Sequence, residues 1–453
     1  MMLRLSIFAC CMALAFNSAK AESPRLSLAT FNVDVTPPLG SPLWDGLVPP
    51  ADRIDDPLNA RGVVLLGSGQ PIVLCAVDWV GIGNTGHDAW RAALAEAAGS
   101  TAERVAVHAL HQHDAPGCDF AAEEILAAYG LAGEQFHVAF AREAIQRVAE
   151  SIRAAIPTAR KVTHLGLGSG KVEQVASNRR ILGADGKVQL VRLSSSRDPQ
   201  AQAAPEGTID PDVQLISFWE DDQPLAVLSY YATHPQSYYG RGAVSADFVG
   251  LARSMREAAL PGVPHIHFNG AGGNVAAGKY NDGSPEKRPL LAERLAAGMR
   301  AAWEATTKTP LSAGDLEWRV APVQLPAAEY LVEADLIARI ENPNGAMRDR
   351  IAAGRGLARM RRATAGPIEL SCMKLGQAYL LHMPGELFVE YQLAARAIKP
   401  EDFVTMAAYG DYGPGYIGTK IAYSQGGYET SVVSRVSPAA EDVLMPAIRE
   451  LLR

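Results

Sequence analysis

The chain has 453 residues, of which 48% are hydrophobic and 20% are charged, the composition of a globular protein with a large core. The formal net charge is −7, and no cluster of Lys and Arg offers the positive surface that nucleic acid requires. We therefore expect no nucleic-acid partner.

The N-terminal segment is predicted to be a signal peptide. Arg4 supplies a positive charge, and residues 5–16 form an apolar run that is too short to span a bilayer as a mature helix. Ala19-Lys20-Ala21 then has the small-x-small pattern of a cleavage site. We expect a signal peptide over residues 1–21 and a secreted or periplasmic product. No later segment is predicted to span a membrane, so contact with a membrane surface is expected to be transient.

The cysteines argue against a disulfide scaffold. Cys10 and Cys11 fall in the predicted signal peptide, and a lipoprotein attached through either would lack a preceding apolar stretch. Cys75, Cys118 and Cys372 remain, which allows one disulfide at most. Because no CxxC pair occurs, a metal site in this chain would have to use nitrogen and oxygen ligands.

Strands and helices alternate along the chain. In the first third, strands are predicted over 27–35, 62–66, 72–77 and 105–109, a hairpin turn over 67–70, and helices over 87–98 and 123–155, the latter broken near Gly130 and Gly133. Residues 161–219 are predicted to form strands and turns.

The remainder of the chain continues this alternation. Strands are predicted over 225–232, 265–268 and 377–383, and helices over 246–259, 286–306, within 329–362 and after 386. The mixture indicates the α/β class, with mixed β-sheets and flanking helices. Since no internal repeat or linker is visible, residues 22–453 are predicted to form a single domain.

The segment 105–117 carries the most chemical information. An apolar run leads into His111 and His113, and a Pro-Gly turn follows. Residues two apart on a strand face the same side, so the two imidazoles are expected to share one pocket, one as a metal ligand and the other as a hydrogen-bond donor. The alternative for this segment alone is a pair of core or surface histidines.

Two further segments end a predicted strand with a potential ligand. His234 follows the apolar run 225–232, and Glu386 follows the strand 377–383 and a Pro-Gly turn. Taken separately, the histidine fits a structural role and the glutamate fits a helix N-terminus, where the dipole favours a carboxylate. Two strand-terminal histidines in one chain favour a shared site.

Taken in order, these segments resemble the neutral ceramidase family. That family has an HxHxGP-type segment, a strand ending in His-Pro, a (V/M)PGE segment, and a YxT segment followed by a stretch rich in Glu-Tyr and Gln. The corresponding segments here are 111–116, 233–235, 383–386, 415–419 and 425–429, and further matches are Asn178-Arg179 and 31–36. The resemblance covers nearly the whole mature chain and implies a neutral-ceramidase-like catalytic domain, without the C-terminal immunoglobulin-like domain usual in the family.

The resemblance implies a zinc site and its surroundings. The Zn²⁺ ligands would be His111, His234, Glu386 and Tyr416. A tyrosine ligand is unusual because its pKa is normally about 10, but a divalent cation stabilises the phenolate.

The resemblance also implies the residues that act on the substrate. His113 and Tyr428 would donate hydrogen bonds to the developing oxyanion, and Arg179 would orient a polar or charged part of the substrate. Asn274 is the fourth residue of the predicted catalytic set and stands where the family has a serine. Because of this replacement, we expect the head group recognised here to differ from that of the family.

The predicted activity is zinc-dependent hydrolysis of an amide in N-acyl-sphingosine or a related N-acyl lipid. Bound zinc lowers the pKa of water from about 15.7 to about 7 and so supplies hydroxide at neutral pH. No GxSxG motif indicates a serine hydrolase of the α/β-hydrolase type. The alternatives are a zinc hydrolase of another N-acyl or ester substrate, such as an acylated amino sugar or a peptide, and a catalytically inactive binding relative.

Overall fold

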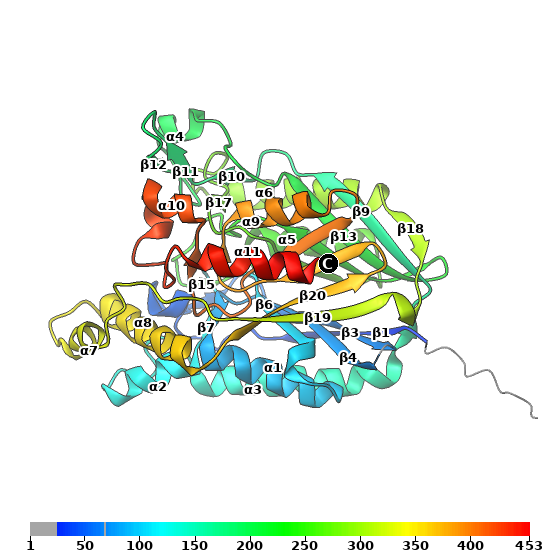
Figure 1. Cartoon of the computed structure of the whole chain (residues 1–453), viewed down its shortest axis with the longest axis horizontal. Coiled ribbons are helices and arrows are strands. Elements are labelled where there is room, and N and C mark those ends of the chain that lie inside the picture. The colour runs from blue at the N-terminus through cyan, green and yellow to red at the C-terminus, as the bar shows by residue number, and fades with distance from the viewer. Residues whose placement is uncertain (1–24, 68) are drawn as a thin grey trace, which may run out of the picture.

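The computed structural model describes residues 25–67 and 69–453. The predicted signal peptide and Ser68 of the predicted hairpin turn lie outside these residues. Sheets that contain both parallel and antiparallel strands, with helices packed against them, confirm the predicted α/β class (Figure 1). Among the described helices, none combines the length and the apolarity that a bilayer crossing requires.

Three larger sheets are built on the same connection. In each, two antiparallel strands in succession are followed by a helix and then by a strand parallel to the second. The units are β3 (Asn59–Gly67), β4 (Gly69–Val77), α1 (Asn84–Ala98) and β6 (Val105–Ala109); β13 (Asp212–Glu220), β14 (Gln223–Tyr231), α5 (Asp247–Ala259) and β16 (His265–Asn269); and β20 (Ile368–Leu375), β21 (Ala378–His382), α9 (Val389–Ile398) and β23 (Phe403–Ala407). The helix crossover places the carboxyl ends of each parallel pair at one edge of its sheet.

Additional strands widen these sheets. They are β1 (Ser27–Asp34) and β8 (Arg160–Lys161) in the first sheet, β9 (His164–Lys171) and β18 (Thr307–Pro310) in the second, and β19 (Leu316–Val323) in the third. The resulting strand orders are β6-β4-β3-β1-β8, β16-β14-β13-β9-β18 and β19-β20-β21-β23.

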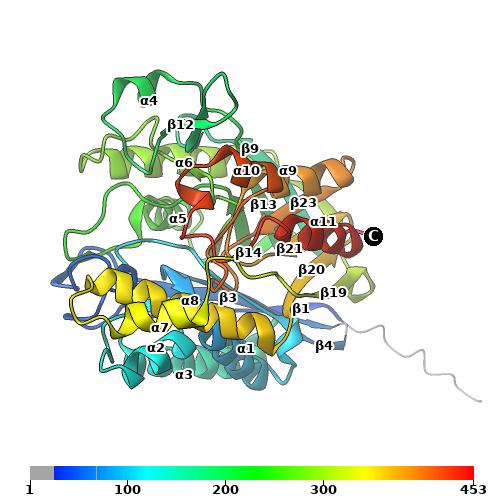
Figure 2. The same cartoon turned by 60° about the vertical axis from the view of Figure 1, so that its left-hand side comes forward.

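Helices cover the outer faces of the three sheets. They are α1 with α3 (Val138–Ala155) on the first sheet, α5 with α6 (Lys287–Glu304) on the second, and α9 with α11 (Ala440–Leu451) on the third (Figures 1 and 2). The inner faces meet in one shared core, to which Leu74, Leu228 and Leu380 contribute from the three sheets. Because both faces of each sheet are buried, the central strands are apolar throughout rather than alternating. The shared core is consistent with a single domain over residues 22–453, and the single domain stays a prediction.

Two details of the predicted helices can be compared directly with the structure. The predicted helix over 123–155 is two helices, α2 (Phe120–Ala128) and α3, and Gly130 and Gly133 between them both have positive φ, as their place in the predicted break suggests. The predicted helical region 329–362 contains α7 (Glu333–Glu341) and α8 (Met347–Ala365). The three cysteines of the described residues are free and buried.

Candidate metal centre

The predicted metal ligands all follow the carboxyl end of a strand in one of the parallel pairs. His111 follows β6, His234 follows β14, Glu386 follows β21 and Tyr416 follows β23. The crossover connections bring these strand ends to one side of the molecule, which is where open α/β sheets place their sites. Residues separated by up to 305 positions in the chain are thereby brought together.

Three of these side chains face one another at distances that fit a cation between them. The Nε2 atoms of His111 and His234 lie 3.3 and 3.0 Å from Oε2 of Glu386, and the three ligand atoms lie within 4.8 Å of one another. The hydroxyl oxygen of Tyr416 lies 3.2 Å from Nε2 of His234. All four side chains are buried.

The hydrogen bonds of the two imidazoles fix which nitrogen faces the centre. Nδ1 of His111 lies 2.6 Å from the carbonyl oxygen of Val80, and Nδ1 of His234 lies 2.7 Å from that of Gly272. A carbonyl oxygen only accepts, so each Nδ1 carries a hydrogen, and a neutral ring presents the Nε2 lone pair to the carboxylate of Glu386. Two lone pairs and a carboxylate oxygen repel unless a cation lies among them, and carbonyl acceptors at Nδ1 are typical of metal-bound histidines.

The carboxylate at the centre is in its charged form. Burial by itself would raise the pKa of Glu386, but the positive charge and Nε2–H hydrogen bonds that His111 and His234 provide when protonated hold its pKa well below the usual range. A cation held between the neutral rings would act in the same direction. Tyr412, from the loop after β23, donates a hydrogen bond of 3.0 Å to Oε1. One oxygen of the carboxylate is therefore held by a neighbouring hydroxyl while the other faces the two histidines.

Glu386 and Tyr416 are held together by the backbone as well. They are register partners in a parallel ladder formed by β22 (Glu386–Leu387) and β24 (Tyr416–Ile417). Burial raises the pKa of Tyr416 well above its ordinary value, and Arg179 opposes that rise because a guanidinium favours the phenolate.

His111 and His113 come close by a route different from the predicted one. We expected them two apart on a strand, but β6 ends at Ala109 and both histidines lie in the following loop, so that expectation was wrong. His111 has φ 72°, a left-handed conformation that costs a non-glycine residue about 1–3 kcal/mol and is concentrated at functional sites. The turn brings Nε2 of His113 to 3.4 Å from Nε2 of His111.

Aromatic rings hold the imidazole of His113. It stacks on Trp44 with ring centroids 4.1 Å apart and meets the edge of Tyr239 at 4.6 Å. Burial, followed by the neighbouring His111, keeps the pKa of His113 well below 6.5, so the ring is neutral. Its Nδ1 is buried without a hydrogen-bond partner. A rigid neutral imidazole with one unused nitrogen is suited to a hydrogen bond with a bound molecule.

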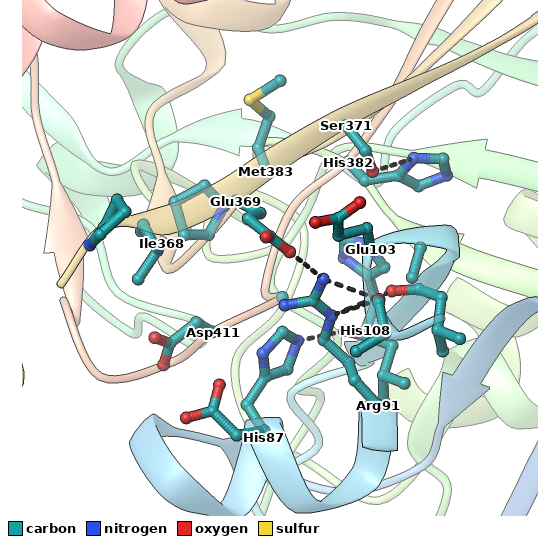
Figure 3. Close-up of a pocket in the computed structure, with 18 of the residues that line it drawn as sticks. His87, Arg91, Glu103, His108, Ile368, Glu369, Ser371, His382, Met383 and Asp411 are labelled. Carbon is teal, nitrogen blue, oxygen red and sulfur yellow. Dashed lines mark hydrogen bonds and ion pairs between the residues drawn. The ribbon is translucent and has the colours of Figure 1, made fainter. Parts of the chain in front are cut away.

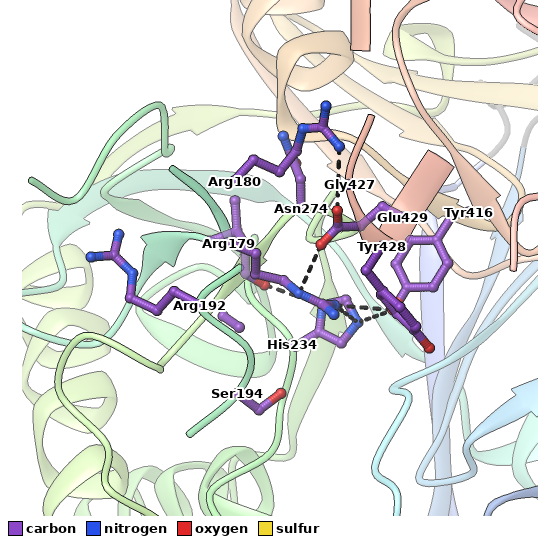
Figure 4. Close-up of polar contacts among 12 residues, drawn as sticks. Arg179, Arg180, Arg192, Ser194, His234, Asn274, Tyr416, Gly427, Tyr428 and Glu429 are labelled. Carbon is purple, nitrogen blue, oxygen red and sulfur yellow. Dashed lines mark hydrogen bonds and ion pairs between the residues drawn. The ribbon is translucent and has the colours of Figure 1, made fainter. Parts of the chain in front are cut away.

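Arg179 contacts two of the predicted metal ligands. Its Nη1 donates to the hydroxyl oxygen of Tyr416 at 3.0 Å and lies 3.2 Å from Nε2 of His234, while its Nε lies 3.1 Å from the carboxylate of Glu429 (Figure 4). Glu429 is fully buried and also pairs with Arg180 at 3.3 Å. One carboxylate thus fixes the guanidinium that contacts two predicted ligands.

Asn274 is fully buried. Its Nδ2 donates to Glu390 at 2.8 Å, its Oδ1 accepts from the backbone N–H of Val389 at 2.9 Å, and its own carbonyl accepts from the N–H of Arg179 at 2.8 Å. The side chain therefore ties α9 to the glycine-rich turn, and the backbone holds Arg179. These contacts are those of a positioning residue.

We expect Asn274→Ala to lower stability more than metal content. The substitution leaves the buried N–H of Val389 without an acceptor, at a cost of about 1–3 kcal/mol. Thermal unfolding of the variant should begin at a lower temperature than that of the wild type, with zinc still bound stoichiometrically. An unchanged unfolding temperature together with lost zinc would contradict this assignment.

Tyr428 lies at the mouth of the pocket that contains the centre. Its side chain is 41% exposed, and its ring contacts that of Tyr416, with centroids 5.8 Å apart. The pocket has a volume of about 190 Å³, and its lining comprises His111, His113, Arg179, His234, Glu386, Tyr416 and Tyr428, together with Trp44, Leu47, Leu193, Ser194, Tyr239, Arg355, Tyr412, Gly415, Val433 and Arg435. Of the predicted site residues, Asn274 is the one that does not line this pocket.

Sequence analysis missed three contributors to the centre. Tyr412 holds the carboxylate of Glu386, Glu429 fixes Arg179, and Trp44 stacks on His113. Glu429 directly follows Tyr428, so a charge next to a predicted catalytic residue was a usable signal. Trp44 offered none, because its loop is 69 residues from His113 and has no motif of its own.

A second polar cavity, between α1 and β20, is a weaker candidate for a catalytic site. Its arginines are already paired, Arg91 with Glu369 (Figure 3) and Arg362 with Asp88. Because both arginines are paired and no metal-ligating cluster occurs there among the described residues, we assign this cavity no role in catalysis.

The fold is known from solved structures. One, described as a ceramidase complexed with C2, aligns with a TM-score of 0.70 and 18% identity over 94% of this chain and 75% of that chain. Another, a neutral ceramidase from Pseudomonas aeruginosa, aligns with a TM-score of 0.68 and 18% identity over 95% of this chain and 74% of that chain. No protein-family model matches the sequence, and no curated protein does. The chain therefore has the fold of these ceramidases.

Proposed function

We propose that this chain is an exported, zinc-dependent hydrolase that cleaves the amide bond of N-acyl-sphingosine or a related N-acyl lipid. The observation that carries the proposal is the meeting of His111, His234 and Glu386 within 4.8 Å in a chain with the fold of ceramidases. Export rests on the predicted signal peptide, residues 1–21.

The donor set fits zinc. Two imidazoles, one carboxylate and one phenolic oxygen are nitrogen and oxygen ligands of the kind found in zinc sites. When bound, the ion supplies Lewis acidity and hydroxide at neutral pH. The pocket beside His111 and Glu386 leaves one side of this set open to a substrate, as a catalytic rather than a structural site requires.

The side chains around the centre provide the remaining functions. Arg179 holds the hydroxyl oxygen of Tyr416 and favours its phenolate. His113 and Tyr428 both line the pocket and can donate hydrogen bonds to the oxyanion of a tetrahedral intermediate, each donor typically lowering the barrier by about 3 kcal/mol. Leu47, Leu193 and Val433 in the lining offer apolar surface to an acyl chain.

The proposal is tested by metal content and by product release. Purified protein should contain one zinc per chain and should release fatty acid from an N-acyl-sphingosine analogue, with activity lost to a chelator and restored by zinc. Zinc without cleavage of this lipid would favour a hydrolase of another N-acyl or ester substrate. The absence of both zinc and hydrolysis of any acyl compound would favour an inactive binding relative.

Tyr428→Phe should separate catalysis from metal binding. We expect kcat to fall by about 100-fold, because one oxyanion donor is removed, while zinc content stays unchanged. Steady-state kinetics and metal analysis of the same preparation measure both. Loss of zinc in this variant would instead assign Tyr428 as a ligand.

A further inference from the structure

Arg435 lines the pocket beside the predicted ligands and is only 9% exposed. Its Nη1 donates to the carbonyl oxygen of Gly413 at 3.2 Å, and a Cβ built on Gly415 would lie 3.1 Å from the same atom. The guanidinium therefore lies against Gly415, the residue that precedes Tyr416 in the chain. The carbonyl oxygen of Gly415 in turn accepts a hydrogen bond from the N–H of Glu386. Among residues 25–67 and 69–453, no carboxylate forms an ion pair with it.

Apart from Glu386, which faces the two histidines, the carboxylates near the pocket are paired with other arginines. Arg355, which also lines the pocket, pairs with Asp45 at 2.8 Å. Arg179 shares the single carboxylate of Glu429 with Arg180 (Figure 4). The pocket wall therefore carries more guanidinium charge than carboxylate charge, unlike the second cavity, whose arginines are each paired.

A buried guanidinium without a counter-charge is unfavourable unless a bound molecule supplies that charge. Burial, and then the neighbouring Arg355, lower the pKa of Arg435, which is the direction expected of a cation that lacks a partner. A carboxylate brings one negative charge and two acceptor oxygens that match the guanidinium fork. Arg435 lines the pocket in which the amide would bind.

We propose that the substrate is an anionic N-acyl compound, an N-acyl amino acid, whose carboxylate binds Arg435 while its acyl chain lies on Leu47, Leu193 and Val433. This inference rests on the proposed amide hydrolysis. In the reaction one water adds to the acyl carbon, the C–N bond breaks and a C–O bond forms. The water's hydrogen goes to the departing amine, so the products are a fatty acid and a free amino acid.

Two probes that differ only in charge test the inference. Wild-type protein loaded with zinc is assayed with N-lauroylglycine and with N-lauroylglycinamide, and laurate release is measured. We expect kcat/KM for the carboxylate to exceed that for the neutral amide by about 10- to 100-fold, the range of a hydrogen bond to a charged group. The preference should diminish at high ionic strength.

Variants assign the preference to the side chain. Arg435→Gln should remove the preference for the carboxylate, measured as the ratio of kcat/KM for the two probes, and Arg435→Lys should keep part of it. Arg449→Gln is the matched control, because it removes the same charge from an exposed position on α11 and should change neither value. Thermal unfolding and zinc content verify that each variant is folded.

Each outcome decides one proposal. Equal wild-type rates on the two probes would overturn the anionic-substrate inference and leave the hydrolase standing, even if Arg435→Gln failed to fold. A preference that survives in folded Arg435→Gln would also overturn it. Hydrolysis of neither probe nor of an N-acyl-sphingosine analogue, with zinc bound, would instead remove the proposed function.

Discussion

Replacing His111 by alanine should abolish zinc binding and lower turnover by more than about 100-fold. Loss of residues that merely orient a ligand typically costs about 10- to 100-fold in metal affinity or activity, and His111 is a predicted ligand itself. The substitution removes one of the two nitrogens that face Glu386 and leaves its buried carboxylate with one imidazole partner. Metal analysis after dialysis and amide hydrolysis by the same sample measure the two effects.

A second buried histidine provides the control for this experiment. His267 is also 1% exposed, and its Nδ1 lies 2.9 Å from the hydroxyl oxygen of Ser229, away from the predicted ligands. His267→Ala should lower stability without removing zinc. Full zinc content and activity in His111→Ala would contradict the proposed metal centre. Equal loss of zinc in both variants would show only that the core is sensitive to substitution.

Replacing Arg179 by methionine should lower kcat by about 100- to 1000-fold while zinc stays bound, because a preorganised charged donor is lost from the site and the four predicted ligands remain. Arg179 contacts both Tyr416 and His234, so its loss also frees the phenolic oxygen to protonate. Zinc content and single-turnover kinetics separate an effect on chemistry from one on metal binding.

Arg180 provides a matched comparison. It pairs with the same carboxylate of Glu429, but its other guanidinium nitrogen donates to the carbonyl of Ala422 rather than to the predicted ligands. Arg180→Met should therefore lower the unfolding temperature and change kcat by less than about tenfold. If both variants lost kcat equally, the role of Arg179 would reduce to balancing the charge of Glu429.

The fold class and the candidate ligands that follow two of the strands could be predicted from local signals, whereas the full ligand set was implied by the family resemblance. Strands such as β4 and β14 are short apolar runs, and the potential ligands His234 and Glu386 follow their strands directly, so each was visible without knowledge of any distant contact. The chain order of these segments, matched to the family, supplied the partners of His111. The resemblance was confirmed at the level of the fold.

Other features depended on neighbours remote in sequence. Asn274 was predicted to act on the substrate, but its bonds to Val389 and Glu390 exist only because α9 packs against the glycine-rich turn. The turn that gives His111 its positive φ, and so brings His113 to it, is held by a backbone hydrogen bond to the carbonyl of Trp79. Neither contact could be predicted from the local pattern of apolar and polar residues.

The sequence by itself determined which residue types end the strands, because apolar runs and the polar residues that follow them are local properties. Only the tertiary structure decided how those strand ends converge and what charge surrounds them. Whether Arg435 has a counter-charge, for instance, depends on Asp45 being held by Arg355, and those residues lie 310 positions apart. Pairing of buried charges is a property of packing in three dimensions, and packing is set by the whole chain.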